Sequence, residues 1–122
     1  MSSNSGLVDW VSEALDGAGS ITARKMFGGL ALYIDGRIFA MIADDLLWFK
    51  SDATSDSLWE DAGCARFTFD FGEGKMAGSM NYRRAPDDVY DDPESMRHWA
   101  GIAIEAAYRA PTKKPKPKKT KS

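Results

Sequence analysis

The sequence has few of the residues that most often carry chemistry in small proteins, with one cysteine, Cys64, and one histidine, His98. A single cysteine excludes an internal disulfide and a cysteine-rich metal site, and a single histidine excludes a histidine cluster. Both counts argue against a zinc enzyme or a Cys–His hydrolase. We expect His98 to be a partly exposed structural residue and Cys64 a buried or half-buried thiol without a chemical role. No pair of adjacent aspartates matches a calcium loop, so we expect neither a catalytic nor a metal site and no cofactor.

Long hydrophobic runs are also missing. No apolar stretch approaches the roughly 20 residues that a membrane helix needs. The polar N-terminus lacks the basic and then apolar order of a signal peptide. We therefore expect a cytoplasmic protein that does not contact a membrane. The length of 122 residues, with 43% hydrophobic and 28% charged residues, is typical of one globular domain with one core.

The charges are unevenly distributed along the chain. Residues 1–110 hold 10 Lys and Arg and all 18 Asp and Glu, which gives a formal charge of −8. Residues 111–122 hold six lysines and no acid, together with prolines that block a helix. The sequence therefore predicts a folded acidic domain over residues 1–110 and an extended, mobile Lys/Pro-rich tail over residues 111–122.

Residues 24–50 are the part of the chain with the clearest pattern. Asp35-Gly36 separates two apolar runs and is typical of a two-residue hairpin turn, and Asp44-Asp45 is a weaker turn signal. The pattern predicts three antiparallel strands over residues 22–34, 37–43 and 46–50. Gly28 and Gly29 interrupt the first of them, which indicates a bulge, a bend or a close backbone approach. Trp48 and Phe49 point to opposite faces of the third, so one should be less buried and mark a partner surface.

Helices and a second hairpin complete the predicted fold. Apolar spacing predicts helices over about residues 6–16 and 53–62, with Leu58, Trp59 and Ala62 packed inward. Strands follow over residues 65–71 and 75–82. Asp92-Pro93-Glu94 is the strongest helix start in the chain, and that helix extends to about residue 108. The order α-β-β-β-α-β-β-α predicts an α+β domain with an antiparallel five-stranded sheet covered by helices.

The stretch ARKMFGGLALYIDGRIFAMIADDLLWFK at 23–50 resembles the opening of the TfoX N-terminal domain family, the TfoX/Sxy-like competence regulators. The strand FTFDF, Met80-Asn-Tyr82 and RRAPDDVYDDPE at 83–94 agree with it in order, over about residues 7–109 in all. The resemblance implies the N-terminal domain of this family, with a secretion-chaperone-like fold, and we expect that domain to stand alone here. It also implies a regulatory or adaptor role in competence gene expression, with no catalytic activity or cofactor.

Two clusters of residues are candidate contact sites. Arg24 and Lys25 beside the Gly28-Gly29 pair could hold an anion, and the alternative is a bulge that bends the strand. Tyr82, Arg83 and Arg84 could stack on a base or bind a phosphate. The alternative for this second cluster is that the arginines pair with nearby aspartates while Tyr82 packs. Those aspartates are Asp87, Asp88, Asp91 and Asp92.

The basic tail is a third candidate contact site. It could bind nucleic acid without sequence preference, because it has neither an aromatic residue nor an arginine. Alternatively it only keeps the acidic domain soluble. Its lysines are Lys113, Lys114, Lys116, Lys118, Lys119 and Lys121.

Three functions remain open from the sequence. The first is a non-enzymatic regulatory or adaptor domain, monomeric or weakly dimeric, that contacts a protein partner such as the transcription machinery. The second is weak nucleic-acid binding through the tail. The third is an enzyme or small-ligand binder.

Overall fold

The computed structural model describes residues 3–26, 29–43, 45–70 and 77–110. The chain forms, in order, α1 (Ser3–Ala14), β1 (Ile21–Met26), β2 (Gly29–Ile34), β3 (Arg37–Ala43), β4 (Leu46–Lys50), α2 (Asp56–Asp61), β5 (Arg66–Asp70), β6 (Ala77–Arg84), the 3-10 helix η1 (Asp87–Tyr90) and α3 (Pro93–Arg109). The strands make one antiparallel sheet in the order β1-β2-β3-β4-β6-β5. The predicted α+β class is confirmed. The predicted tail and Gly28 lie outside the described residues.

The sheet has six strands where the sequence predicted five. The single strand predicted over residues 22–34 is a hairpin, in which β1 pairs with β2 from Ile21 opposite Ile34 to Met26 opposite Gly29. Gly29 also lies tightly against β3, since a Cβ atom on it would fall 2.0 Å from the carbonyl oxygen of Ile42. The close backbone approach is therefore present at Gly29, and the chain reverses direction there instead of continuing through a bulge.

Local signals placed most of the other elements correctly. Asp35 and Gly36 both have positive φ, at 49° and 84°, as a tight hairpin turn requires. Asp92 accepts a hydrogen bond from the Glu94 amide at 3.0 Å and caps α3, with Pro93 in the first turn. One 3-10 turn, η1, follows Pro86.

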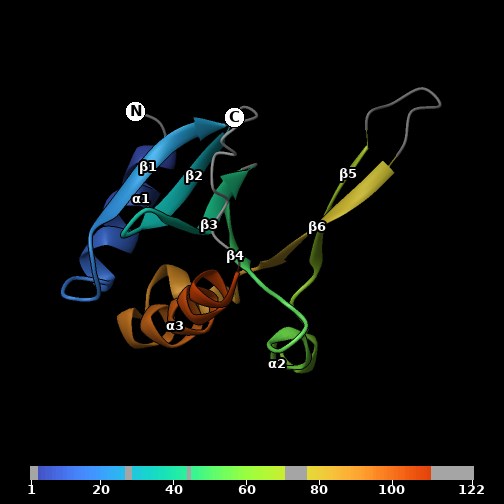
Figure 1. Ribbon diagram of the computed structural model, residues 1–122. Helices are drawn as coiled ribbons and strands as arrows, with labels where there is room; N and C mark the ends of the chain where they lie inside the picture. The colour runs from blue at the N-terminus through green and yellow to red at the C-terminus, as the bar shows by residue number, and fades with distance from the viewer. Residues whose placement is uncertain (1–2, 27–28, 44, 71–76, 111–122) are drawn as a thin grey trace, which may run out of the picture.

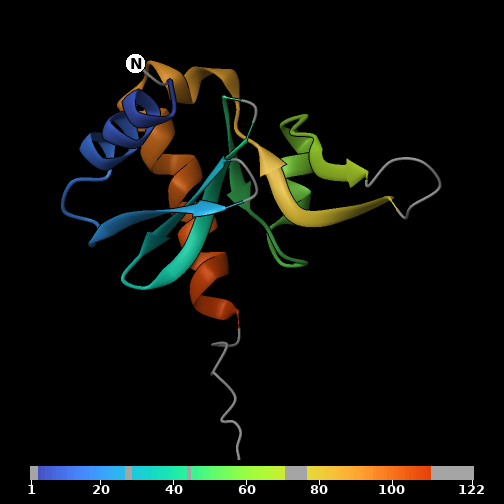
Figure 2. The same cartoon turned by 90° about the horizontal axis from the view of Figure 1, so that it is seen from above.

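All helices pack against one face of the sheet (Figure 1). Val11 of α1 and Leu15 just after that helix belong to the same buried core cluster as Leu32 and Ile34 of β2. The inner face of α3 is rich in alanine and allows close packing on β3 and β4, and its buried members are Met96, Ala100, Ala103, Ala106 and Ala107. From above, β5 and β6 extend as a curved ribbon away from this body (Figure 2).

The helix α2 differs most from its prediction. It is shorter, and Leu58 and Ala62 are exposed where they were expected to pack inward. Trp59 is buried as predicted and stacks on Phe49 and Trp99, with ring centroids 5.7 and 4.9 Å away. The reason is charge, because Asp56 and Glu60 lie one turn apart and face a buried arginine of the sheet.

An ion pair joins the segment before α2 to the end of α3. Arg109 donates to both carboxylate oxygens of Asp52, at 2.8 and 3.0 Å. That bond, helped by Ser55, lowers the pKa of Asp52 to about 2 against the opposing effect of burial. Because the folded-state pKa lies below the unfolded value, the stabilisation is complete above about pH 4 and disappears as the pH falls toward 2.

We therefore expect Asp52→Asn to flatten the acid dependence of stability. The variant should be less stable than wild type at pH 6, and the difference should shrink steadily between pH 4 and pH 2. The measurement is the urea midpoint at several pH values, with Asp9→Asn on the exposed side of α1 as control. A constant gap down to pH 2 would mean that the ion pair does not stabilise the fold.

Candidate functional site

The register of the sheet sets one continuous row of side chains across five strands. Arg24 lies opposite Ala31, Ala31 opposite Met41, Met41 opposite Trp48, and Trp48 opposite Arg84. Directly opposed residues of an antiparallel sheet point to the same face. The neighbouring row, which contains Phe49 and Arg83, faces α2. The first row therefore lies on the face that the helices leave uncovered.

We call this surface the open face and define it by its larger side chains. They are Arg24, Tyr33, Met41, Trp48, Lys50, Phe67, Tyr82 and Arg84.

Aromatic rings and cations are paired on the open face. The guanidinium carbon of Arg24 lies 6.0 Å from the centre of the Tyr33 ring, and Lys50 Nζ lies 5.7 Å from that of Tyr82. Both distances are within the range of a cation–π contact. Trp48 meets Phe67 edge to face, with centroids 4.9 Å apart and planes at 81°.

The open face is concave. Trp48 and Phe67 make contact although β6 lies between their strands, which indicates that the sheet curves toward this side (Figure 2). Tyr82 is only 5% exposed, and its burial raises its pKa to about 12, with a smaller contribution from Tyr33. Tyr82 therefore forms the floor of the surface, while the half-buried rings of Tyr33 and Trp48 remain accessible.

The charge of the open face is of one sign. Among the strand residues that the structure describes on it, Arg24, Lys50 and Arg84 are cationic and none is acidic. The chain as a whole contains 18 acidic residues, so the cations are concentrated where carboxylates are lacking.

The structure brings together three of the residues predicted from sequence. Arg24, Tyr82 and Arg84 lie on the open face. Lys25 is opposite Leu30, a residue packed against the core, so it points to the other side of the sheet from Arg24. Gly29 is covered by the backbone of β3, and Gly28 lies outside the described residues, as do the lysines of the tail.

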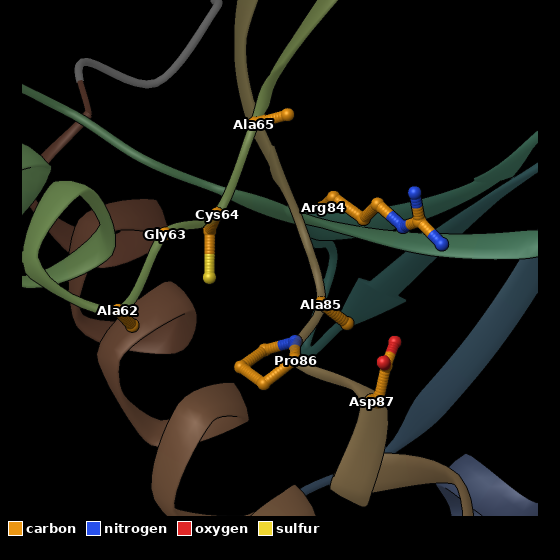
Figure 3. A pocket seen from close by; sticks show the side chains of 8 residues that line it. All are labelled: Ala62, Gly63, Cys64, Ala65, Arg84, Ala85, Pro86 and Asp87. Carbon is orange, nitrogen blue, oxygen red and sulfur yellow. The ribbon is translucent and has the colours of Figure 1, made fainter.

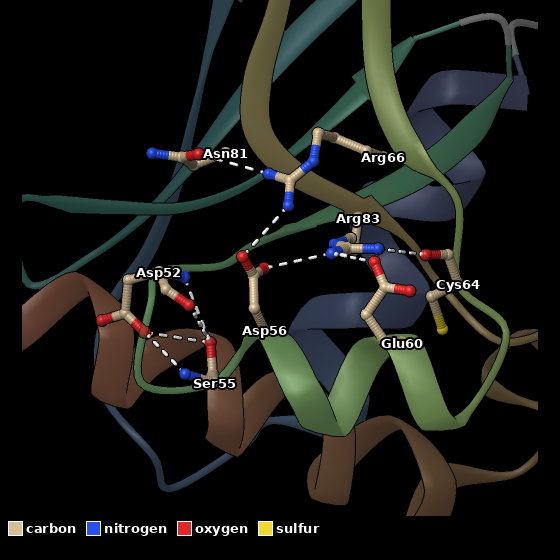
Figure 4. A network of polar contacts seen from close by, with 8 residues as sticks. All are labelled: Asp52, Ser55, Asp56, Glu60, Cys64, Arg66, Asn81 and Arg83. Atoms are coloured by element: carbon tan, nitrogen blue, oxygen red, sulfur yellow. Dashed lines mark hydrogen bonds and ion pairs between the residues drawn. The ribbon is translucent and has the colours of Figure 1, made fainter.

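Arg83 has a structural position. It is 3% exposed and donates to the carbonyl oxygen of Cys64 at 2.8 Å, to Glu60 at 2.7 Å and to Asp56 at 3.3 Å (Figure 4). Arg66 binds the other oxygen of Asp56 at 3.0 Å. The pairing with aspartates 87–92 that sequence suggested for Arg83 is therefore wrong, and its partners come from α2.

A small pocket lies beside the open face, where the start of β5 passes the end of β6. It has a volume of about 330 Å³ and is lined by residues 62–65 and 84–87 (Figure 3). Burial raises the pKa of the Cys64 thiol, which keeps it protonated at neutral pH and makes it a poor nucleophile. The side chains of Arg84 and Asp87 project away from the thiol (Figure 3).

His98 is exposed and packs edge-on against Trp99, with centroids 4.9 Å apart. Within the described ranges, no group of three His, Cys, Asp or Glu residues is arranged to hold a metal ion. None of the helices in that part of the chain combines the length and hydrophobicity that crossing a bilayer requires.

Sequence reasoning found part of the open face. It predicted that one of Trp48 and Phe49 would be less buried, and this is confirmed, since Phe49 is 0% exposed and Trp48 is half-buried. Their strand is central and not at an edge. Tyr33, Lys50 and Phe67 were not predicted to belong to this surface. Each of them alternates along its strand with residues that face the helices, so it lies on the same face as the predicted contact residues.

Comparison with known proteins gives two matches. The TfoX N-terminal domain matches residues 6–107 of this chain. The DNA transformation protein TfoX1 of Aliivibrio fischeri is 33% identical over 49 residues, which are 40% of this chain and 23% of that protein. The chain thus spans less than a quarter of this relative's length in the matched region. Since the domain match covers nearly all of the described residues, the chain belongs to the TfoX N-terminal domain family.

Proposed function

We propose that this chain is a non-enzymatic regulatory or adaptor domain that acts through protein contacts in the control of DNA competence and transcription. Membership of the TfoX N-terminal domain family supports the regulatory role. The similar protein from Aliivibrio fischeri carries DNA transformation in its name, which supports the link to competence. Transcription proteins are the class of partner that this role requires.

The observation that carries the proposal is the uncovered aromatic surface. Every helix packs on the opposite side of the sheet, while Tyr33, Trp48 and Phe67 remain half-buried on the open face. Half-buried aromatic residues next to cations are enriched where proteins bind one another, because they offer a large apolar area with a polar rim. The features of Cys64 and His98 described above support a role without covalent chemistry.

The test is affinity capture from a cell extract with the intact chain, with and without nuclease. We expect Trp48→Ala to reduce the recovery of bound protein at least about tenfold, the usual effect of removing an aromatic anchor. Leu58→Ala is the matched control, because Leu58 is a large apolar residue, 48% exposed, on α2. Equal recovery with both variants would rule out the open face as the contact surface.

The same experiment separates protein binding from nucleic-acid binding through the tail. A chain lacking residues 111–122 should retain its partners if the folded domain binds them. If capture requires the tail, is abolished by nuclease and falls steeply with salt, the basic tail binds nucleic acid.

A further inference from the structure

We infer that the open face recognises an extended, acidic segment of a partner protein that also carries aromatic or aliphatic side chains. This inference rests on the proposed function and specifies the chemistry of the bound segment.

The first argument is charge complementarity. Residues 1–110 carry a formal charge of −8, yet the described strand residues of the open face include three cations and no acid. An acidic ligand would be repelled by most of the acidic domain and attracted to this face, which favours binding there.

The second argument is that the cations are already positioned. Arg24 and Lys50 lie over the rings of Tyr33 and Tyr82, so each side chain is held against an apolar surface with its polar hydrogens free to face outward. Arg84 has no ion pair within the described part of the chain. Carboxylates of a ligand could bind these groups without breaking an existing salt bridge.

The third argument is spacing. Arg24 and Arg84 are the ends of a row that crosses five strands, which corresponds to about 19 Å in a flat sheet at about 4.8 Å per strand. An extended peptide rises about 3.3 Å per residue, so about six or seven residues cover this distance. Alternate side chains of such a peptide point the same way, which puts acids over the two ends and apolar groups over the half-buried Trp48 and the buried Met41 beside it.

A single-stranded nucleic acid fits the surface less well. Base stacking needs free ring faces. Here Arg24 covers a face of Tyr33, Tyr82 is buried, and Phe67 meets the Trp48 ring. The acidic character of the whole domain also opposes a polyanion that extends beyond this surface.

The experiment uses the full chain and synthetic probes. The first probe is a seven-residue peptide with Asp at both ends and Phe and Leu at alternate positions between them. The second has Lys in place of each Asp, and the third is an oligothymidylate of twelve nucleotides. Dissociation constants are measured by fluorescence anisotropy, and amide shifts in ¹H–¹⁵N spectra locate the binding site.

We expect the acidic peptide alone to bind and to shift the amides of β1–β4 and β6. Arg24→Gln with Lys50→Gln should weaken its binding at least tenfold. The control pair Lys25→Gln with Arg97→Gln removes the same charge from positions outside the open face and should change the dissociation constant less than twofold. Thermal unfolding of each variant checks that it is folded.

Three results would overturn the inference: no binding of the acidic peptide, equal loss with both pairs of variants, or tighter binding of the oligothymidylate to the open face. Self-association that shifts the same amides would identify a second copy of the chain as the occupant. If Trp48→Ala still abolishes capture of a protein partner in any of these cases, the proposed function stands and only the acidic chemistry is wrong.

Discussion

Gly29→Ala is expected to lower the free energy of unfolding by about 3 kcal/mol or more, near the upper end of what overpacking costs. The added Cβ atom would lie 2.0 Å from the carbonyl oxygen of Ile42 and 3.2 Å from its carbon. Both are backbone atoms of β3, so no side-chain rotation relieves the clash. The central pairing of β2 with β3 must open, and the strands on both sides of it are displaced.

The control for this prediction is Gly101→Ala. A Cβ atom at Gly101 has no heavy atom within 4 Å, and Gly101 lies inside α3. Alanine is favoured over glycine within a helix by about 0.5–1 kcal/mol, so this variant should be more stable than wild type. Urea unfolding followed by circular dichroism measures both changes. If Gly29→Ala loses no more than about 1 kcal/mol, the tight β2–β3 approach is not a real constraint.

Arg83→Met is expected to lose about 2–3 kcal/mol, whereas Arg84→Met should change stability by less than about 0.5 kcal/mol. Removing the Arg83 guanidinium leaves the carbonyl oxygen of Cys64 without its donor, and Asp56 and Glu60 without a buried partner. Glu60 is 65% exposed and can be hydrated instead, which places the loss below that of a fully buried pair.

The comparison of the two adjacent arginines is the informative result. Arg83 fastens α2 to β6, and Arg84 points to the open face, so stability and binding should separate between them. Thermal or urea unfolding gives the first quantity, and the anisotropy assay gives the second. Equal destabilisation by the two substitutions would show that the ion network around α2 is not what holds that helix in place.

Features that depend on nearby residues were predictable from the sequence. The helix start at Asp92 and the turn at Asp35-Gly36 follow from interactions within a few residues, and the structure confirms both. The hairpin between β1 and β2 was missed because a pair of glycines reads equally well as a bulge and as a reversal. Only the pairing of Met26 with Gly29 distinguishes the two.

The site depended on register, which composition does not reveal. Arg83 and Arg84 are adjacent and chemically alike, yet one faces the helices and the other the open face, because successive strand residues alternate. Which of the two pointed inward was fixed by the pairing of β6 with β4 across more than thirty residues of sequence. The same long-range pairing places Arg83 under α2, where Asp56 and Glu60 bind it. For this reason the acidic side of α2, and not Leu58, faces the sheet.

The way β6 joins the sheet has a consequence for the order of folding. Strands β1–β4 pair with their immediate neighbours in sequence, while β6 meets β4 through three residue pairs, from Trp48 with Arg84 to Lys50 with Tyr82. Closing that long loop costs more chain entropy than closing a tight turn. Strands β1–β4 should therefore pair early, and the β5–β6 hairpin should join them at β4 late. In hydrogen-exchange experiments the amides of β6 should accordingly open at lower free energy than those of β3.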